Sequence, residues 1–245
     1  MKLNDVSQGV VKMNNKELVF VWSAKIRMFH WVNVICILLL MAIGLIIFNA
    51  KMLGISVDAK ISLKTWHVLI GYVFAINLLF RLLLGWIGKG FERFAKMLPF
   101  MSGFISDLKA FKANTNKVYQ GHNPVGKLMV AMLLVGMINQ MITGLLLAST
   151  DIYYPPLGNY FAGQIAVDKT AIESIKPYSK NNVDPQAYQQ MRDIRYPFVY
   201  MHVDGFYFLL GLIPLHIAAV VYAERKHKQG LVSAMINGHK YLPKD

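Results

Sequence analysis

The sequence predicts an all-α integral membrane protein, built as a bundle of four transmembrane helices. Two observations support this fold class. Of the 245 residues, 55% are hydrophobic and only 16% are charged, and the mean hydropathy is +0.39, which is too apolar for an ordinary soluble domain. Four separate apolar segments also reach the roughly 20 residues that a helix needs to cross the hydrocarbon core of a bilayer.

The four apolar segments divide the chain into a membrane domain with polar ends. We expect the spans at residues 28–49, 65–88, 125–149 and 197–222. Trp31, Trp66 and Trp86 lie near ends of the first two spans, where aromatic residues favour the membrane interface. The first apolar run is too long for a signal-peptide core, so we expect it to stay as an anchor. The predicted parts are an N-terminal segment (1–27), a membrane domain (28–222) and a tail (223–245).

The distribution of Lys and Arg predicts the orientation of the spans. Five of these residues lie in 1–27, six in 89–124 and five after Tyr222, against three in 50–64 and five in 150–196. The last of these loops also holds five acids, so its net charge is zero. Because basic residues favour the cytoplasmic side, we expect a multi-pass protein of the bacterial inner membrane with both termini in the cytoplasm. The net charge of +13 then suits a membrane lipid surface, and no nucleic-acid motif accompanies it.

Two connections are long enough to have structure or function of their own. In the 89–124 loop, apolar residues at helical spacing predict a helix along the membrane surface. The alternative is a solvated loop with scattered aromatic residues, and Pro99 favours a break there. The residues at this spacing are Phe91, Phe94, Leu98, Met101, Ile105 and Leu108. The exported loop 150–196 is rich in Tyr, Pro and Asn and shows little periodicity, so we expect it to be functional or partly disordered.

Four histidines lie inside or at the ends of the predicted spans, where ionisable residues are functional candidates. By the orientation above, His30 and His216 lie toward the cytoplasm, and His67 and His202 lie toward the outer face. His202 and His216 are fourteen residues apart, which in a helix is about 21 Å along the axis and a return to nearly the same face. The histidines therefore form two pairs at two depths.

Two stacked histidine pairs are what two b haems require, because haem iron accepts one imidazole on each side of its plane. The single cysteine, Cys36, excludes a disulfide framework, a cysteine-ligated iron-sulfur cluster and the C-x-x-C-H attachment of c-type haem. A haem in this chain must therefore be held without covalent attachment, and we expect two haem b groups.

Two further residues recur at the same fourteen-residue spacing. Gly44 follows His30 by fourteen residues, so it is expected on the ligand face beside the outer haem, where a missing side chain lets the macrocycle approach. Arg81 follows His67 by fourteen residues, near the cytoplasmic end, where it could pair with a propionate of the inner haem. Close helix packing by Gly44 and snorkelling by Arg81 are the plainer alternatives.

Other readings of the histidines remain open at this point. A histidine in an apolar helix can simply be a structural hydrogen-bonding group. A zinc site needs three or four ligands around one ion, which the separation of about 21 Å along one helix opposes. A transporter or channel would need intramembrane acids or broken helices, which are scarce here.

Several motifs together resemble one known family. They are RMFHW (27–31), WHVLIG (66–71) with Arg81 after it, GHNPVGK (121–127), the His202 and His216 pair, and LVSAMINGHKYL (231–242). This combination resembles the b-type cytochrome subunit of membrane-bound nickel-iron hydrogenases, in the wider group that includes the gamma subunit of respiratory formate dehydrogenase. The resemblance extends from about residue 20 to residue 242.

The resemblance implies a dihaem electron-transfer subunit rather than a complete enzyme. The outer haem would have His67 and His202 as axial ligands, and the inner haem His30 and His216. Menaquinone or ubiquinone would bind on the cytoplasmic side at Asn123, with His122 as a neighbour, although Asn123 before Pro124 also has the pattern of a plain helix cap.

The partner implied by the resemblance is an exported hydrogenase-like redox protein, with electrons passing between it and the quinone pool. The sequence TDIYYPPLGNYFAG (150–163) in the exported loop does not clearly follow the hydrogenase pattern. Two alternatives therefore stay open: a quinol-oxidising cytochrome that feeds a periplasmic c-type cytochrome or reductase, and a transmembrane reductase that works without quinone.

Overall fold

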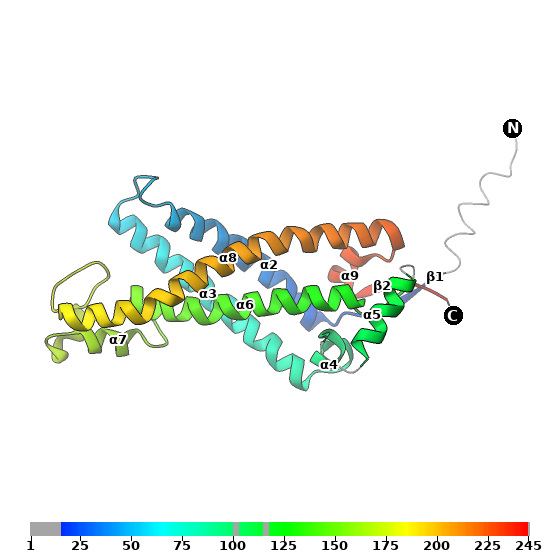
Figure 1. The fold of residues 1–245 in the computed structure, drawn as a ribbon, viewed down its shortest axis with the longest axis horizontal. Coiled ribbons are helices and arrows are strands. Elements are labelled where there is room, and N and C mark those ends of the chain that lie inside the picture. Colours follow the sequence, from blue (N-terminus) through cyan, green and yellow to red (C-terminus); the bar gives the residue numbers. More distant parts are fainter. Residues whose placement is uncertain (1–15, 100–102, 115–117, 245) are drawn as a thin grey trace, which may run out of the picture. The chain divides into compact units, whose positions relative to one another are not determined.

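The computed structural model describes residues 16–99, 103–114 and 118–244 of the chain. Among them, four helices are long and apolar enough to cross a membrane, which confirms the four-span prediction (Figure 1). These helices are α2 (Ala24–Phe48), α3 (Val57–Ile87), α6 (Pro124–Asp151) and α8 (Pro185–His227).

The outward surfaces of these helices are apolar. Leu38 of α2, Ile76 of α3 and Val135 of α6 are exposed by 62%, 69% and 65%. Apolar side chains exposed along whole helices are unfavourable in water but are expected in contact with lipid. Beyond the first turn, the backbone N–H groups of an α-helix donate to carbonyls of the same helix, as a membrane span requires.

Capping residues, rather than the limits of the apolar segments, determine where three of the helices begin. The Oγ of Ser56 accepts from the N–H of Ala59 at 3.2 Å, the Oδ1 of Asn123 accepts from Gly126 at 2.7 Å, and the Oδ1 of Asp184 accepts from Ala187 at 2.7 Å. Each side chain satisfies an N–H group that the first turn leaves free. As a result, α3 begins at Val57 rather than at residue 65, and α8 begins at Pro185 rather than at residue 197.

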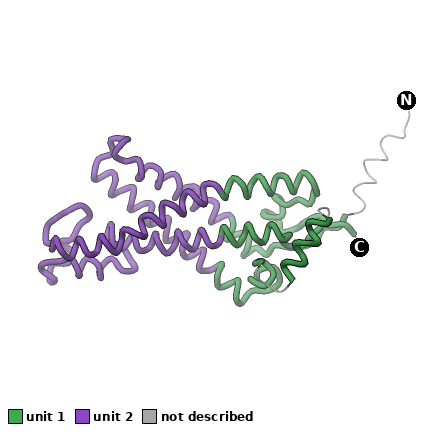
Figure 2. Tube along the Cα trace, viewed as in Figure 1, with its two compact units in different colours: residues 1–30, 81–133, 212–245 green, residues 31–80, 134–211 purple. Residues whose placement is uncertain are grey.

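The chain forms two compact units, which are coloured separately in Figure 2. Unit 1 comprises residues 1–30, 81–133 and 212–245, and unit 2 comprises residues 31–80 and 134–211. Each of the four long helices contributes residues to both units.

Unit 1 joins the first and last described segments of the chain. Strand β1 (Lys16–Phe20) pairs antiparallel with β2 (His239–Pro243). Just after β1, the backbone N–H groups of Val21 and Trp22 donate to the carbonyl of Gly238 at 2.8 and 3.0 Å. Gly238 ends α9 (Leu231–Asn237) with a φ of 89°, a left-handed conformation that favours glycine. These contacts attach the tail motif around Gly238 to the segment that leads into α2.

The 89–124 connection of unit 1 is helical in part and is interrupted at Pro99, as the proline indicated, while its placement along the membrane surface stays a prediction. The connection contains η1 (Gly90–Glu92), α4 (Phe94–Met97) and α5 (Phe104–Ala113). A proline disfavours helical backbone in the residue before it, and α4 ends at Met97, just before Leu98 and Pro99. Met101, which belonged to the predicted helix, lies outside the described residues.

The 150–196 connection of unit 2, for which a function or partial disorder was expected, is a folded segment. It holds α7 (Gly158–Ile165) and η2 (Lys169–Ser174), and the first turns of α8 continue from it. Its core is a cluster of buried apolar side chains: Phe161, Ala162, Ile165, Ala166, Ile175 and Met191. The periodicity is hard to see in the sequence because the helices are short and each buries only a few residues.

Candidate haem sites

Unit 2 brings together His67 of α3 and His202 of α8, the two histidines predicted at the outer face. Their ring centroids are 6.3 Å apart and their planes are inclined by 73°. Imidazole nitrogens bind a metal ion at about 2.0 Å, so two imidazoles on opposite sides of one ion have centroids about 6 Å apart. The observed separation therefore fits two axial ligands of one haem iron.

A glycine of a neighbouring helix lies against each of these two imidazoles. A Cβ atom at Gly44 of α2 would be 3.2 Å from the Cε1 of His67, and one at Gly144 of α6 would be 3.3 Å from the Cε1 of His202. Both distances are tighter than ordinary contacts to a Cβ atom. Gly44 was predicted beside the outer pair from its spacing in the sequence, whereas Gly144 was not predicted.

Polar side chains of α6 surround His202. The Oγ1 of Thr143 lies 2.8 Å from the Nδ1 of His202. Gln140 donates from Nε2 to the carbonyl of His202 at 2.8 Å, and Asn139 donates from Nδ2 to the carbonyl of Met201 at 2.9 Å. By contrast, the buried Nδ1 of His67 has no hydrogen-bond partner among the residues that the structure describes.

The other predicted pair, His30 of α2 and His216 of α8, lies in unit 1. Both side chains are half-buried, and they are close enough to interact electrostatically. The described part of the chain contains no cluster of three or more His, Cys, Asp or Glu residues suited to a metal ion. Isolated histidine pairs fit haem, because the porphyrin supplies four nitrogens to the iron and the protein only the axial ligands.

Arg81 of α3 is buried, with 3% of its surface exposed. Its Nη1 donates to the carbonyl of Glu92 at 2.9 Å, and its Nη2 contacts the sulfur of Met97. The guanidinium also lies 5.9 Å from the ring centroids of Phe29 and Phe94. These contacts place the positive charge inside unit 1. Its pairing with a haem propionate stays a prediction.

The residues before α6 form a second cluster in unit 1. Asn123 caps α6 through Oδ1, which confirms the helix-cap interpretation of the HNP motif. The ring of the preceding His122 lies 4.8 Å from the ring of Trp22. Burial, reinforced mainly by the nearby charges of Lys240 and Arg81, lowers the pKa of His122 to about 3. This imidazole is therefore neutral at physiological pH.

Lys240 holds the loop before His122 in place. Its Nζ donates to the carbonyls of Gln120 and Gly121 at 2.9 Å each and lies 5.3 Å from the centroid of the Trp22 ring. Sequence reasoning gave no role to Trp22 or Lys240. A signal was present, since Lys240 lies within the motif at 231–242 and Trp22 lies just before the motif at 27–31, but only the folded chain brings the two segments together.

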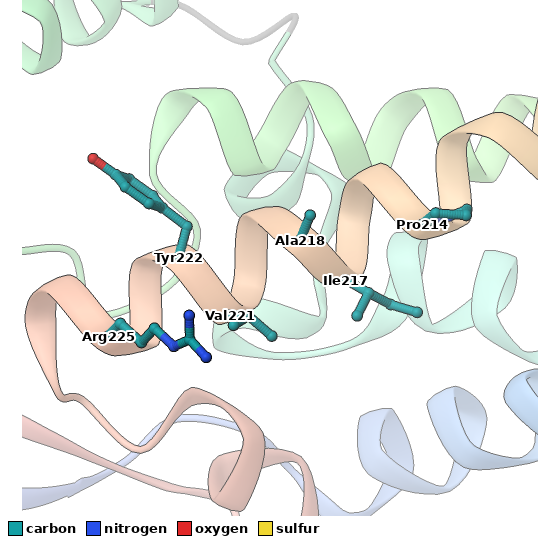
Figure 3. A pocket seen from close by; sticks show the side chains of 6 residues that line it. All are labelled: Pro214, Ile217, Ala218, Val221, Tyr222 and Arg225. Carbon is teal, nitrogen blue, oxygen red and sulfur yellow. The ribbon is translucent and has the colours of Figure 1, made fainter.

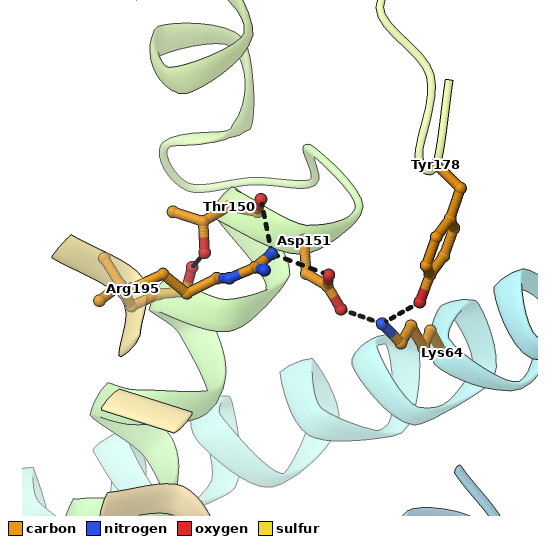
Figure 4. A network of polar contacts seen from close by, with 6 residues as sticks. Lys64, Thr150, Asp151, Tyr178 and Arg195 are labelled. Atoms are coloured by element: carbon orange, nitrogen blue, oxygen red, sulfur yellow. Dashed lines mark hydrogen bonds and ion pairs between the residues drawn. The ribbon is translucent and has the colours of Figure 1, made fainter. Parts of the chain in front are cut away.

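An ionic network lies in unit 2 at the end of α6 (Figure 4). The carboxylate of Asp151 pairs with the Nζ of Lys64 from α3 and, at 2.9 Å, with the Nη1 of Arg195 from α8. Lys64 also donates to the hydroxyl of Tyr178 at 2.6 Å, and Arg195 to the carbonyl of Thr150 at 3.4 Å. The network joins three long helices to the 150–196 connection.

An apolar groove of about 500 Å³ follows one face of α8 in unit 1 (Figure 3). It is lined by Pro214, Ile217, Ala218, Val221, Tyr222 and Arg225. None of the predicted haem or quinone residues lines this groove, so it is separate from the candidate site.

Known proteins resemble this chain over nearly its whole length. The family described as prokaryotic cytochrome b561 matches residues 21–238. A probable Ni/Fe-hydrogenase B-type cytochrome subunit of Azotobacter vinelandii is 23% identical, over 98% of this chain and 96% of its own length. The protein of the same name from Rhodobacter capsulatus is 24% identical, over 97% of this chain and 87% of its own length. No solved structure matches the chain.

Proposed function

Since this chain belongs to the prokaryotic cytochrome b561 family, and is therefore a membrane b-type cytochrome, we propose that it is a dihaem electron-transfer subunit. It carries electrons between an exported hydrogenase-like partner and the quinone pool. The observation that carries the proposal is the separation of 6.3 Å between the rings of His67 and His202, which suits one iron between two imidazoles.

Each residue of the candidate site has a defined part in this proposal. His67 and His202 hold the outer haem, with Gly44 leaving room beside His67. His30 and His216 hold the inner haem, and Arg81 supplies a cation on the same side of the membrane. When bound, each haem supplies a one-electron Fe(III)/Fe(II) couple.

Quinone binding is proposed at Asn123, with His122 beside it. In support, the amide nitrogen of Asn123 is not used by the helix cap, which needs only the Oδ1 atom. The imidazole of His122 is neutral because of its lowered pKa, so it offers a donor and an acceptor without adding charge. Menaquinone and ubiquinone both present carbonyl oxygens that such groups can bind.

The proposed partner follows from the relatives, which are described as probable cytochrome subunits of Ni/Fe-hydrogenases. The exported segment with α7 is the part available to such a partner, because the predicted orientation places it on the outer face. Copurification of a nickel-iron subunit with the tagged chain from its native membrane supports this partner. Copurification of a multihaem c-type protein instead argues against it.

Haem content of the purified chain tests the central proposal. A pyridine haemochrome spectrum with iron quantitation is expected to show two b haems per chain. His67→Ala or His202→Ala removes the outer haem, and His30→Ala or His216→Ala removes the inner one. His239→Ala, in strand β2, is the control that retains both. Two low-spin haems in all four ligand variants, or none in the wild type, would overturn the assignment.

The quinone site has its own test, which keeps the helix cap intact. Asn123→Asp preserves an oxygen that can accept from Gly126, and it replaces the amide NH2 donor proposed for quinone binding with a carboxylate oxygen, which only accepts. We expect unchanged haem content but slower reoxidation of the dithionite-reduced haems by added quinone. An unchanged reoxidation rate with bound haem would exclude Asn123 from the quinone site.

A further inference from the structure

We propose that Thr143 is a positioning residue for His202, which holds the imidazole proton on Nδ1 and so directs the lone pair of Nε2 to the outer haem iron. This inference rests on the proposed function, because it takes His202 as an axial ligand. It concerns a residue to which neither the motifs nor the fourteen-residue spacing gave a role.

Two hydrogen bonds define the direction of the proton. The Oγ1 of Thr143 lies 2.6 Å from the carbonyl oxygen of Asn139 and 2.8 Å from the Nδ1 of His202. A hydroxyl has one proton to donate, and a carbonyl can only accept. The hydroxyl therefore donates to Asn139 and accepts from His202. The imidazole must then carry its proton on Nδ1, which leaves Nε2 free to bind a metal.

The surroundings of Thr143 leave this arrangement little freedom. Its side chain is completely buried. On the same face of α6, Gln140 holds the backbone carbonyl of His202, and Gly144 leaves just enough room for the edge of the ring. The ring is thus fixed on its backbone side, at its edge and at Nδ1, as metal-binding histidines are commonly fixed by groups outside the ligand set.

The two imidazoles of the outer pair differ in this respect. His202 has a hydrogen bond at Nδ1, whereas the buried Nδ1 of His67 has none within the described ranges. A hydrogen bond from Nδ1–H makes an imidazole a stronger electron donor to its metal and favours the oxidised iron. Thr143 is therefore expected to lower the midpoint potential of the outer haem through His202.

The test compares two substitutions of Thr143 with a control on the same helix. Thr143→Val removes the hydroxyl and keeps the shape, and Thr143→Ser keeps the hydroxyl. Thr150→Val is the control, because Thr150 is also buried and, among the described residues, its hydroxyl bonds only to the carbonyl of Leu146. The measurements are the midpoint potentials of both haems and the low-temperature EPR spectrum of the oxidised protein.

We expect Thr143→Val to raise the potential of the outer haem and shift its EPR g values, while the inner haem is unchanged. Thr143→Ser and Thr150→Val should match the wild type. If Thr143→Val loses the outer haem, a wild-type spectrum of Thr143→Ser still supports the role of the hydroxyl. The inference is overturned by wild-type potentials and spectra in Thr143→Val, by loss of the outer haem in Thr143→Ser, or by equal shifts in Thr150→Val. A wild-type chain without haem would instead overturn the proposed function.

Discussion

Gly44 leaves room for the imidazole of His67, which is a proposed haem ligand. A methyl group at this position would be 3.2 Å from the Cε1 of His67, so Gly44→Ala must displace the imidazole. Overpacking of this kind typically costs about 1–3 kcal/mol. We expect the purified Gly44→Ala protein to lose most of its outer haem and keep the inner one, as measured by haemochrome content and redox titration.

Gly211→Ala is the matched control for this substitution. Its added methyl group meets no atom within 4 Å in the described part of the chain, and Gly211 also lies in a long helix of the bundle. Full haem content in both variants would show that the contact between Gly44 and His67 does not limit haem binding.

His122 makes the stability of unit 1 depend on pH. Its pKa falls from 6.5 to about 3 in the folded protein, so the unfolded chain binds more protons between these values. Stability is therefore complete above about pH 6.5 and decreases toward pH 3, by up to about 1.4 kcal/mol per pH unit. We expect the thermal midpoint of the helical circular dichroism signal in detergent to fall between pH 7 and pH 5.

The His122→Gln variant isolates this contribution, because glutamine does not titrate. The pKa of Glu92 is also lowered, mainly by its hydrogen bond from Ser23, but its effect begins below about pH 4.5 and lies outside the chosen window. If wild type and His122→Gln lose the same stability between pH 7 and pH 5, His122 is not buried as a neutral imidazole.

At the level of residues, the fourteen-residue spacing identified residues that share one face of a helix. It did not identify the residues of a neighbouring helix that contact them. His202 and His216 share a helix, so their fourteen-residue separation was enough to place them on one face. Gly44 was found by the same spacing. Thr143 and Gly144 act on His202 from another helix, and the rotation of α6 against α8 depends on packing that no local pattern records.

At the level of elements, we expect the 150–196 connection to depend in part on Asp151 for its attachment to the long helices. Asp151→Asn leaves the cations of Lys64 and Arg195 without their shared carboxylate. Since these groups are partly exposed, we expect a loss of about 1 kcal/mol rather than unfolding. Limited proteolysis should cut the segment between Ile152 and Asp184 faster in this variant, with the four long helices still intact.

Glu173→Gln is the control for Asp151→Asn. Glu173 lies in the same 150–196 connection, is exposed, and its carboxylate forms no ion pair among the residues that the structure describes. If both variants are cut at the wild-type rate, the ionic network does not hold the segment to the long helices. The same conclusion follows if high salt fails to accelerate cleavage of the wild type.

The helices could be predicted from the sequence where their apolar segments are continuous. The four long helices followed from their apolar runs, which a bilayer requires to be helical. The extension of α8 back to Pro185 was not predicted, because its first turns are polar and their start depends on the cap by Asp184. The segment around α7 was missed for a related reason, since its core forms between short pieces that are separate in the sequence.

For the whole molecule, the pairing of β1 with β2 requires both ends of the described chain to lie on the same side of the membrane. Lys16 is opposite Pro243, and Phe20 is opposite His239. Four spans between these strands satisfy the requirement. The pairing does not identify which side this is, so the cytoplasmic assignment depends on the distribution of basic residues.

Cysteine labelling tests that assignment. In a Cys36→Ser background, Glu173→Cys and Lys112→Cys each place one thiol at an exposed position, the first between α7 and α8 and the second in α5. With a membrane-impermeant maleimide on intact spheroplasts, we expect labelling at position 173 and none at 112 until the membrane is lysed. The opposite pattern would reverse the chain in the membrane. The His67–His202 pair would then face the cytoplasm, and the quinone site and the protein partner would exchange sides.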